Sequence, residues 1–366
     1  MYHTRLAVTG VSVTVATLAA SLTACGAVDK GTAASDSGHC KPSAVTLVQS
    51  GRGLENEYYV AVNAGARAFA KSLGVQGKYQ WIASGGDSSK QLSQIQSILA
   101  KGGKCVVLNV DPNESSVLPA IVKAVDKSGA WLVTQWNRPN GMAPEHESAH
   151  WAAHMSVDGV PQGYATAKAL FKAMGGKGAI VALQGILDNA PAQERFQGLK
   201  KALKEYPGIT LLADQTAGWD RTKGQNVTQT YLTKYGRKIT GIWAANDSMG
   251  LGALEAVKNA GRKGQVKIAS IDGLAEAIDQ IQDPSSGYVA TTPSTGAAQG
   301  GLGMAIAYAA ATGHINPDKE PQDHRSFYLK PMPIITRANA SAVPSPTDAT
   351  KLDFKDLWSQ NGRPIK

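Results

Sequence analysis

Two series of short apolar runs, each run followed by a helical pattern, constrain the fold of this chain most strongly. The first series begins at Ala44 with VTLVQ, YQWIAS, CVVLNV and WLVTQW, and the second comprises AIVALQ, ITLLAD, GIWAAN, VKIAS and YVATT. Strands that alternate with helices are typical of parallel sheets in α/β proteins. The 366 residues are enough for two domains of ordinary size. We therefore expect an α/β fold with two similar, doubly wound parallel-sheet lobes.

The first 24 residues have the layout of a secretory signal peptide. Arg5 precedes an apolar run from Leu6 to Ala20, and small residues precede Cys25. The run is short and interrupted by Thr and Ser, which disfavours a membrane span. A cysteine at the cleavage point resembles the bacterial lipoprotein signal, which implies a lipid on Cys25, an extracytoplasmic location and an anchor in the cell membrane. A plain signal peptide is the alternative.

Residues 25–40 comprise this cysteine and a segment rich in Gly, Ala, Ser and Thr, the composition of a flexible tether. Cys40 and Cys105 lie just before or at the start of predicted strands at 44–49 and 105–110. If these strands are parallel neighbours, a disulfide is geometrically feasible in an oxidising compartment. We predict this bridge, with two buried thiols as the alternative.

The charge pattern argues against a nucleic-acid partner. The formal net charge is +9, but Lys and Arg are scattered along the chain instead of forming a basic stripe. A mildly basic surface that faces an anionic cell envelope accounts for this charge.

Polar or aromatic residues follow nearly every predicted strand. Ligands of open α/β sheets bind at the carboxyl ends of strands. Each such residue alone can also be a helix cap, a core ring or a surface ion-pair partner. Their repetition in both series favours a ligand site. The strand-end residues are Asn56, Tyr58, Tyr59, Asn109, Asp111, Trp136, Asn137, Arg138, Asp188, Arg195, Trp219, Asp220, Asn246, Asp247, Asp272 and Ser294.

The stretch LVQSGRGLENEYY, which begins at Leu47, is an incomplete match to a phosphate-binding loop. A dinucleotide fingerprint needs a third glycine where this chain has Asn56. We expect Gly51 and Gly53 to let the loop turn tightly toward an uncharged ligand.

Four segments resemble the ribose-binding family of type I periplasmic binding proteins, the solute receptors of ABC importers. They are AQERFQGL (192–199), WDRTKG (219–224), WAANDSMGLGAL (243–254) and IASIDG (268–273). The resemblance runs from about Val45 to Asn339. It implies two lobes joined by a three-stranded hinge that close around a ligand, as periplasmic binding proteins do. It also implies no enzymatic activity, no cofactor, a monomer, and recognition by ABC permease subunits.

Carried over by position, the resemblance implies a set of ligand contacts. Tyr58 and Tyr59 replace the family's paired phenylalanines. Asn137 and Arg138 replace an Asp-Arg pair, or Trp136 takes the acidic position if the register slips by one residue. Ser294 stands where the family commonly has glutamine. The implied contacts are Asn56, Tyr58, Tyr59, Asn109, Trp136, Asn137, Arg138, Arg195, Trp219, Asn246, Asp272 and Ser294.

The chemistry of these side chains fits a monosaccharide or a sugar alcohol. Each hydroxyl both donates and accepts, so carboxylates, amides and a guanidinium can satisfy a ring of hydroxyls. Large aromatic rings suit the C–H faces of a sugar. A sensory receptor that feeds a membrane kinase and binds a sugar or an autoinducer is the alternative function.

The resemblance also implies the domain boundaries. Crossings between lobes near 138–157, 290–296 and 328–335 would give an N-terminal lobe of 41–138 plus 295–328. The C-terminal lobe would comprise 139–294 plus 329–366. The tail from about Pro344 should lie back on a lobe through Leu352, Phe354 and Trp358.

One competing motif is H-E-x-x-H at His146, Glu147 and His150, with His154 four residues later. Such spacing on a helix binds zinc in metalloproteases. The stretch follows several Pro and Gly residues and lacks an apolar helix face, so we expect polar loop residues. A zinc hydrolase remains the third function considered.

Overall fold

The computed structural model describes residues 39–365 of the chain. The expected signal peptide, the expected lipid site at Cys25 and the tether up to Gly38 lie outside the described residues. None of the helices between residues 39 and 365 has the length and apolar character needed to traverse a bilayer.

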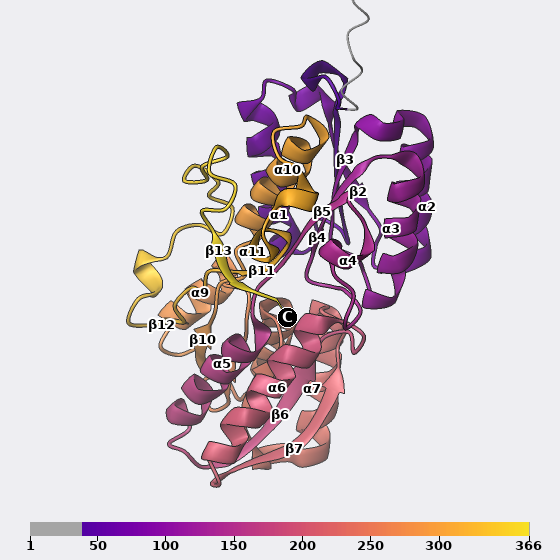
Figure 1. The fold of residues 1–366 in the computed structure, drawn as a ribbon. Coiled ribbons are helices and arrows are strands. Elements are labelled where there is room, and N and C mark those ends of the chain that lie inside the picture. Colours follow the sequence, from indigo (N-terminus) through magenta and orange to yellow (C-terminus); the bar gives the residue numbers. More distant parts are fainter. Residues whose placement is uncertain (1–38, 366) are drawn as a thin grey trace, which may run out of the picture. The chain divides into compact units, whose positions relative to one another are not determined.

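The first lobe is built on a seven-stranded sheet in the order β13-β11-β5-β4-β3-β1-β2 (Figure 1). All neighbours are parallel except β13, which runs antiparallel to β11. The strands are β1 (Thr46–Gly51), β2 (Tyr79–Ala83), β3 (Val106–Val110), β4 (Trp131–Gln135), β5 (Trp151–Ser156), β11 (Ser326–Leu329) and β13 (Asn361–Pro364).

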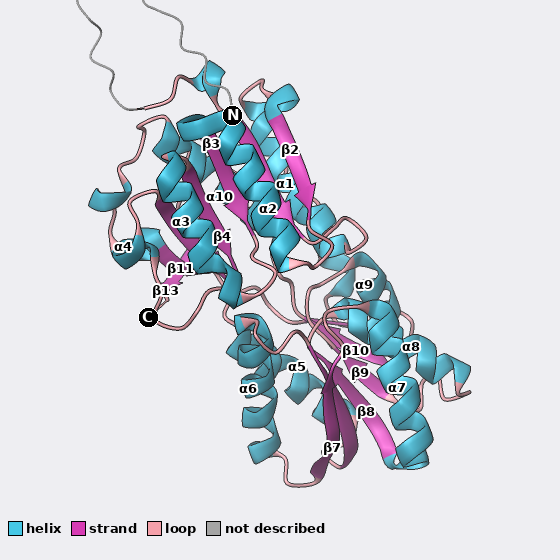
Figure 2. Cartoon of the chain, turned by 90° about the vertical axis from the view of Figure 1, so that its right-hand side faces the viewer, coloured by secondary structure: helices cyan, strands magenta, loops and turns pink. Residues whose placement is uncertain are grey.

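Helices cover both faces of this sheet (Figure 2). One core cluster joins α1 (Glu57–Ser72) and α10 (Gly296–Ala311) to one face, and another joins α2 (Ser88–Gly102) and α3 (Leu118–Ser128) to the other. The short helix α4 (Pro144–Glu147) packs near β5, and α11 (Gln322–Arg325) packs near β5, β11 and β13.

The second lobe has a six-stranded sheet in the order β12-β10-β9-β8-β6-β7, parallel except for β12. One continuous core cluster lies within this lobe. Its strands are β6 (Gly178–Gln184), β7 (Ile209–Thr216), β8 (Ile239–Ala244), β9 (Lys267–Ala269), β10 (Tyr288–Thr291) and β12 (Ile335–Thr336). Its helices are α5 (Gly159–Ala173), α6 (Ala190–Glu205), α7 (Arg221–Tyr235), α8 (Asp247–Asn259) and α9 (Ala275–Gln282). The predicted α/β fold with two lobes is confirmed.

The chain passes between the two sheets four times among the described residues. Three passages, after β5, β10 and β11, fall in or beside the ranges expected for the hinge. The fourth leads from β12 back to β13 and was not expected. The predicted boundaries also differ from the sheet topology, because β5 and β13 lie in the first sheet and not in the second lobe. Every residue of β5 is buried, as a strand between two neighbours requires.

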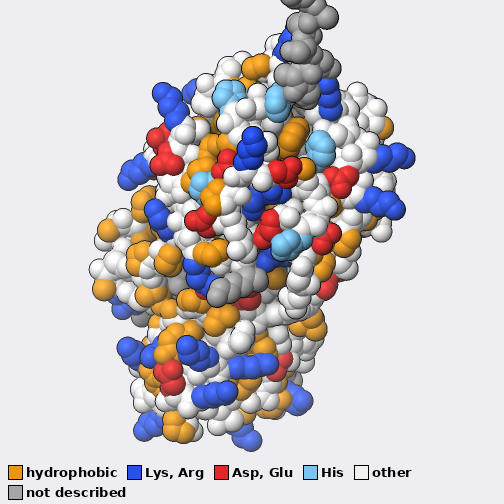
Figure 3. Space-filling model, viewed as in Figure 1, with side chains coloured by type: hydrophobic (Ala, Val, Ile, Leu, Met, Phe, Trp, Pro, Cys, Tyr) orange, Lys and Arg blue, Asp and Glu red, His pale blue; other side chains and the backbone are white. Residues whose placement is uncertain are grey.

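The C-terminal tail packs on the first lobe, through Phe354 and Trp358 as expected. The Trp358 ring stacks on His324 with ring centroids 4.0 Å apart. At the end of the tail, Arg363 Nε donates to Asp158 Oδ2 at 3.1 Å, next to the first passage between lobes. On the face shown in Figure 3, Lys and Arg side chains are spread over both lobes instead of forming one stripe.

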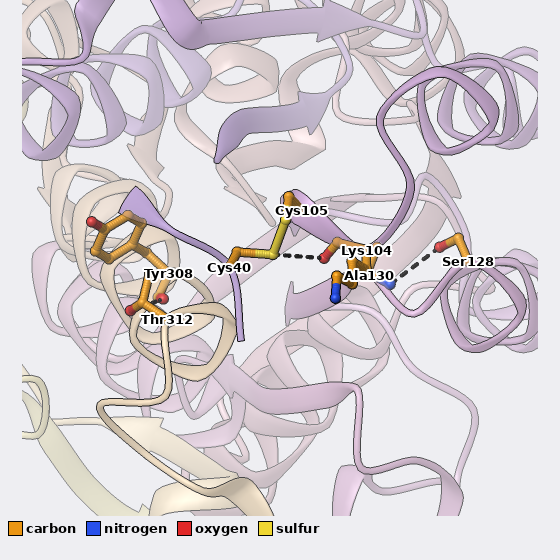
Figure 4. The surroundings of a disulfide bond; sticks show 7 residues. All are labelled: Cys40, Lys104, Cys105, Ser128, Ala130, Tyr308 and Thr312. Atoms are coloured by element: carbon orange, nitrogen blue, oxygen red, sulfur yellow. Dashed lines mark hydrogen bonds between the residues drawn. A yellow bond between two sulfur atoms is a disulfide. The ribbon is translucent and has the colours of Figure 1, made fainter. Parts of the chain in front are cut away.

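The predicted disulfide between Cys40 and Cys105 is present, with a Cα–Cα distance of 5.6 Å (Figure 4). Cys40 also donates its backbone N–H to the carbonyl of Ala311 at the end of α10. The bridge therefore fixes the start of the described chain to the beginning of β3.

Replacing both cysteines, as Cys40→Ser with Cys105→Ser, should lower the free energy of unfolding by roughly 2–4 kcal/mol, because the bridge spans 65 residues and restricts the unfolded chain. Equilibrium unfolding in urea, followed by tryptophan fluorescence, measures this change. Cys25→Ser is the matched control, since it removes a thiol outside the bridge. An unchanged unfolding free energy in the double variant would contradict a stabilising role.

Candidate ligand-binding site

A cavity with about 460 Å³ of empty space lies at the carboxyl ends of strands from both sheets. In open α/β sheets, this edge of a parallel sheet is where small-molecule sites form. The cavity is lined by Arg52, Asn56, Tyr58, Tyr59, Asp111, Trp136, Asn137, Asn189, Pro191, Arg195, Trp219, Asn246 and Asp272.

Nine of the twelve residues predicted as ligand contacts line this cavity. Among them, Asn56 and Asn246 are also helix caps. Asn56 Oδ1 accepts from the backbone N–H of Tyr58, and Asn246 Oδ1 accepts from that of Met249. These two asparagines therefore cap helices and line the cavity at the same time. The nine are Asn56, Tyr58, Tyr59, Trp136, Asn137, Arg195, Trp219, Asn246 and Asp272.

Three predicted residues do not line the cavity. Asn109 is fully buried, and its Nδ2 donates to the carbonyls of Gln299 and Gly300 at 3.0 and 3.2 Å, which ties β3 to α10. Arg138 Nη1 donates to the carbonyl of Met142 at 2.7 Å. Ser294 is buried, and its Oγ donates to the backbone carbonyl of Asp272 at 3.3 Å.

Four cavity residues were not predicted: Arg52, Asp111, Asn189 and Pro191. The sequence places Asp111 among the strand-end residues, whereas the family resemblance implies Asn109 as the ligand contact. Because β3 ends at Val110, the side chain that follows the strand is that of Asp111. Counting from the last strand residue would have found it.

An aromatic cluster forms one wall of the cavity. The Tyr58 ring packs edge to face against Tyr59 and Trp136, with centroids 5.1 and 6.0 Å apart. Trp136 Nε1 donates to Tyr58 Oη at 2.6 Å. The Gln299 amide is best oriented with Nε2 donating to the same oxygen at 2.9 Å. With two bonds accepted, Tyr58 Oη keeps its own proton for a further acceptor.

The Arg195 guanidinium joins the two lobes within the cavity. Its Cζ lies 5.1 Å from the Trp136 ring of the first lobe and 5.6 Å from the Trp219 ring of the second. Nη1 donates to the carbonyl of Ala245 at 2.8 Å and to Asp272 Oδ1 at 3.4 Å. Arg195 is only 3 % exposed, and desolvation strengthens a cation–π contact.

Each lobe contributes one buried carboxyl. Asp111 accepts from Tyr59 Oη at 2.8 Å and from Asn137 Nδ2 at 3.2 Å. Burial raises the pKa of Asp111 to about 7, although these hydrogen bonds and the nearby Arg52 oppose the change. Burial likewise raises the pKa of Asp272 to about 7 against the attraction of Arg195. Both carboxyls therefore change their charge near neutral pH.

Two buried polar atoms of cavity residues have no hydrogen-bond partner within residues 39–365. They are Arg195 Nε, a donor in the second lobe, and Asn137 Oδ1, an acceptor in the first lobe. An unpaired buried polar group costs about 1–3 kcal/mol. Such atoms in a cavity indicate a polar ligand that both accepts and donates.

The backbone is strained where it presents the cavity residues. Only four non-glycine residues in the described part of the chain have positive φ, and three line the cavity: Trp136 at 57°, Trp219 at 68° and Asp272 at 137°. The fourth, Thr295, precedes α10. Such conformations cost about 1–3 kcal/mol each and concentrate at functional sites.

Two glycines make room for the aromatic walls. A Cβ on Gly185 would lie 2.0 Å from Cζ2 of Trp219, and one on Gly51 would lie 2.9 Å from Cη2 of Trp81. Neither Gly51, the last residue of β1, nor Gly53 has a positive φ, so the backbone conformation at these two positions does not require glycine. Gly51 instead lets two rings approach the backbone.

The H-E-x-x-H stretch does not form a metal site. Helix α4 (Pro144–Glu147) ends before the second histidine, so His146 and His150 do not share a helical turn. His154 is buried in β5, with Nδ1 2.8 Å from Thr134 Oγ1. No group of three or more His, Cys, Asp or Glu suited to a metal occurs in the described part of the chain.

Comparison with known proteins agrees with this architecture. A family model described as the periplasmic binding protein domain matches residues 50–315. The chain is 30 % identical over 322 residues to a xylitol-binding protein of Mycolicibacterium smegmatis, covering 88 % of this chain and 83 % of that protein. It is 30 % identical to a ribose import binding protein of Haemophilus influenzae over 65 % of this chain and 76 % of that one.

Solved structures agree as well. A twin-arginine translocation pathway signal protein from Burkholderia phytofirmans superposes with a TM-score of 0.83 at 37 % identity, covering 88 % of this chain and 98 % of that one. A Caulobacter myo-inositol binding protein superposes with a TM-score of 0.71 at 26 % identity, covering 83 % and 97 %. The chain therefore belongs to the periplasmic binding protein family that includes the ribose-binding proteins of ABC importers, which are solute receptors and not enzymes.

Proposed function

We propose that this protein is the extracytoplasmic substrate-binding lipoprotein of an ABC importer and that it closes on one uncharged monosaccharide or sugar alcohol. The printed names of its relatives mention xylitol and ribose, and similar structures contain D-allose, glycerol or myo-inositol. All are small, neutral and rich in hydroxyl groups.

The observation that supports this proposal most strongly is that two buried polar atoms of cavity residues lack a hydrogen-bond partner among the residues that the structure describes. Arg195 Nε needs an acceptor, and Asn137 Oδ1 needs a donor. A hydroxyl group can donate and accept a hydrogen bond at once. A phosphate near neutral pH is mainly an acceptor, with at most one proton left to donate. A molecule with several hydroxyls can satisfy both atoms from one position between the lobes.

The rings and carboxyls of the cavity fit the rest of such a ligand. The faces of Trp136, Tyr58 and Trp219 bury C–H surface at low entropic cost. Asp111 and Asp272 accept hydrogen bonds from hydroxyls when they are ionised. Because both lobes supply these groups, a ligand binds the closed form more tightly than the open form, and this difference drives closure.

The lipid anchor is part of the proposal and depends on Cys25. A lipidated cysteine at the mature N-terminus would hold the receptor at the membrane beside its permease. Detergent phase partitioning of the native protein, compared with Cys25→Ser, tests this point: only the former should enter the detergent phase.

A thermal-shift screen against xylitol, D-ribose, D-allose and myo-inositol should raise the melting temperature for at least one compound, since a ligand that binds only the native state stabilises it. For that compound, Trp219→Ala should weaken binding by about 10- to 100-fold in isothermal titration calorimetry, through lost ring contact. The matched control is Trp358→Ala, which removes a tryptophan outside the cavity. Wild-type affinity in Trp219→Ala would show that the site is misplaced.

Affinity should depend on pH near neutrality. Asp111 and Asp272 have a pKa of about 7 without ligand, and hydroxyl donors stabilise their ionised forms. Binding therefore lowers these pKa values and releases protons, so affinity rises as pH increases from about 6 to 8. Calorimetry in buffers of different ionisation enthalpy measures the release. Asp272→Asn should reduce it, and proton uptake on binding would contradict the assignment.

A further inference from the structure

We propose that Asp188 and Asn189 form a latch, a set of direct hydrogen bonds between the two lobes that holds them together without a ligand. The latch consists of these two residues of the second lobe and Asn113, Ser115 and Ser116 of the first lobe. Asp188 would then set how much of the ligand-free protein is closed, without selecting the ligand. This inference rests on the closing motion of the proposed function.

Asp188 makes three hydrogen bonds across the interface between lobes. Its backbone carbonyl accepts from Ser115 Oγ at 2.7 Å. Its carboxylate Oδ2 accepts from both the backbone N–H and the hydroxyl of Ser116, at 3.1 and 3.0 Å. Asp188 lies between β6 and α6, and the two serines lie between β3 and α3. Opening of the hinge must break these bonds.

Asn189 connects the same interface to the cavity. Its Nδ2 donates to the backbone carbonyl of Asn113 at 3.0 Å, and its Oδ1 accepts from Trp219 Nε1 at 2.7 Å. Asn189 is only 1 % exposed, so both bonds are shielded from water. Asn189 therefore joins the contact between the lobes to the ring of Trp219 that lines the cavity.

The first-lobe half of the latch is held in place from within its own lobe. Asn113 Oδ1 accepts from Ser84 Oγ at 3.0 Å, and its backbone N–H donates to Gln91 Oε1 at 2.9 Å. Asn113 is 1 % exposed. A preformed acceptor at this position lowers the ordering cost of closure.

Asp188 differs from the ligand contacts because it does not line the cavity and its side chain is exposed. Exposed hydrogen bonds contribute modestly. We therefore expect an effect of a few-fold on the ratio of closed to open protein. Apparent affinity scales with the fraction of the protein that is in the binding-competent, closed state. Loss of the latch should therefore lower the affinity for every ligand by a similar factor.

Distances between spin labels on the two lobes test the latch in the ligand-free protein. Labels at Lys123→Cys in α3 and Gln197→Cys in α6, in a Cys25→Ser background, report the closed and open populations. Asp188→Ala should lower the closed-to-open ratio about fivefold, and Asp188→Asn, which keeps an acceptor oxygen, should restore most of it. Leu187→Ala is the matched control, since this neighbouring side chain is 57 % exposed. Thermal unfolding of each variant confirms that it is folded.

The double variant distinguishes a latch from a general loss of stability. Ser116→Ala should lower the ratio about twofold alone but add little to Asp188→Ala, because its hydroxyl bonds to that carboxylate. A wild type with no closed population, or a ratio that Asp188→Ala leaves unchanged, would overturn the proposal. If none of xylitol, D-ribose, D-allose and myo-inositol binds, the proposed function fails, while the ligand-free distances still test the latch.

Discussion

The buried guanidinium of Arg195 is the interaction on which the arrangement of the cavity depends. A charge removed from water is costly unless it is paired and hydrogen-bonded. Arg195 finds Asp272 and a backbone carbonyl in its own lobe, but it also lies over Trp136 of the other lobe. Its environment is therefore complete only when the lobes are together, apart from Nε, which a ligand can satisfy.

The fold and most of the cavity could be predicted because two general rules apply along the whole chain. Alternating strands and helices give parallel sheets, and their carboxyl ends carry the ligand groups. Asp272 and Trp219 lie in the loops that follow β9 and β7, and both line the cavity. Asn109 lies buried within β3 while Asp111 lines the cavity. Strand ends read from a sequence are uncertain by a few residues. A shift of one or two residues exchanges a core side chain for a cavity side chain.

Other features depend on contacts that no local pattern records. Strand β5 lies between the short helix α4 and helix α5, and the histidines at 146, 150 and 154 suggested a motif instead of a buried strand. Strand β13 contains Gly362 and Pro364, which are rare in strands, yet an edge strand tolerates them. The hydrogen bonds of Asp188 join segments 72 residues apart in the chain and arise only when two lobes meet.

The central claim is that both lobes bind one uncharged, polyhydroxylated molecule in this cavity. A crystal structure of the protein with the sugar or polyol that stabilises it most tests the claim directly. We expect hydroxyl groups within hydrogen-bonding distance of both Arg195 Nε and Asn137 Oδ1, with the ligand against Trp219. A ligand bound elsewhere, or held by one lobe alone, would contradict it.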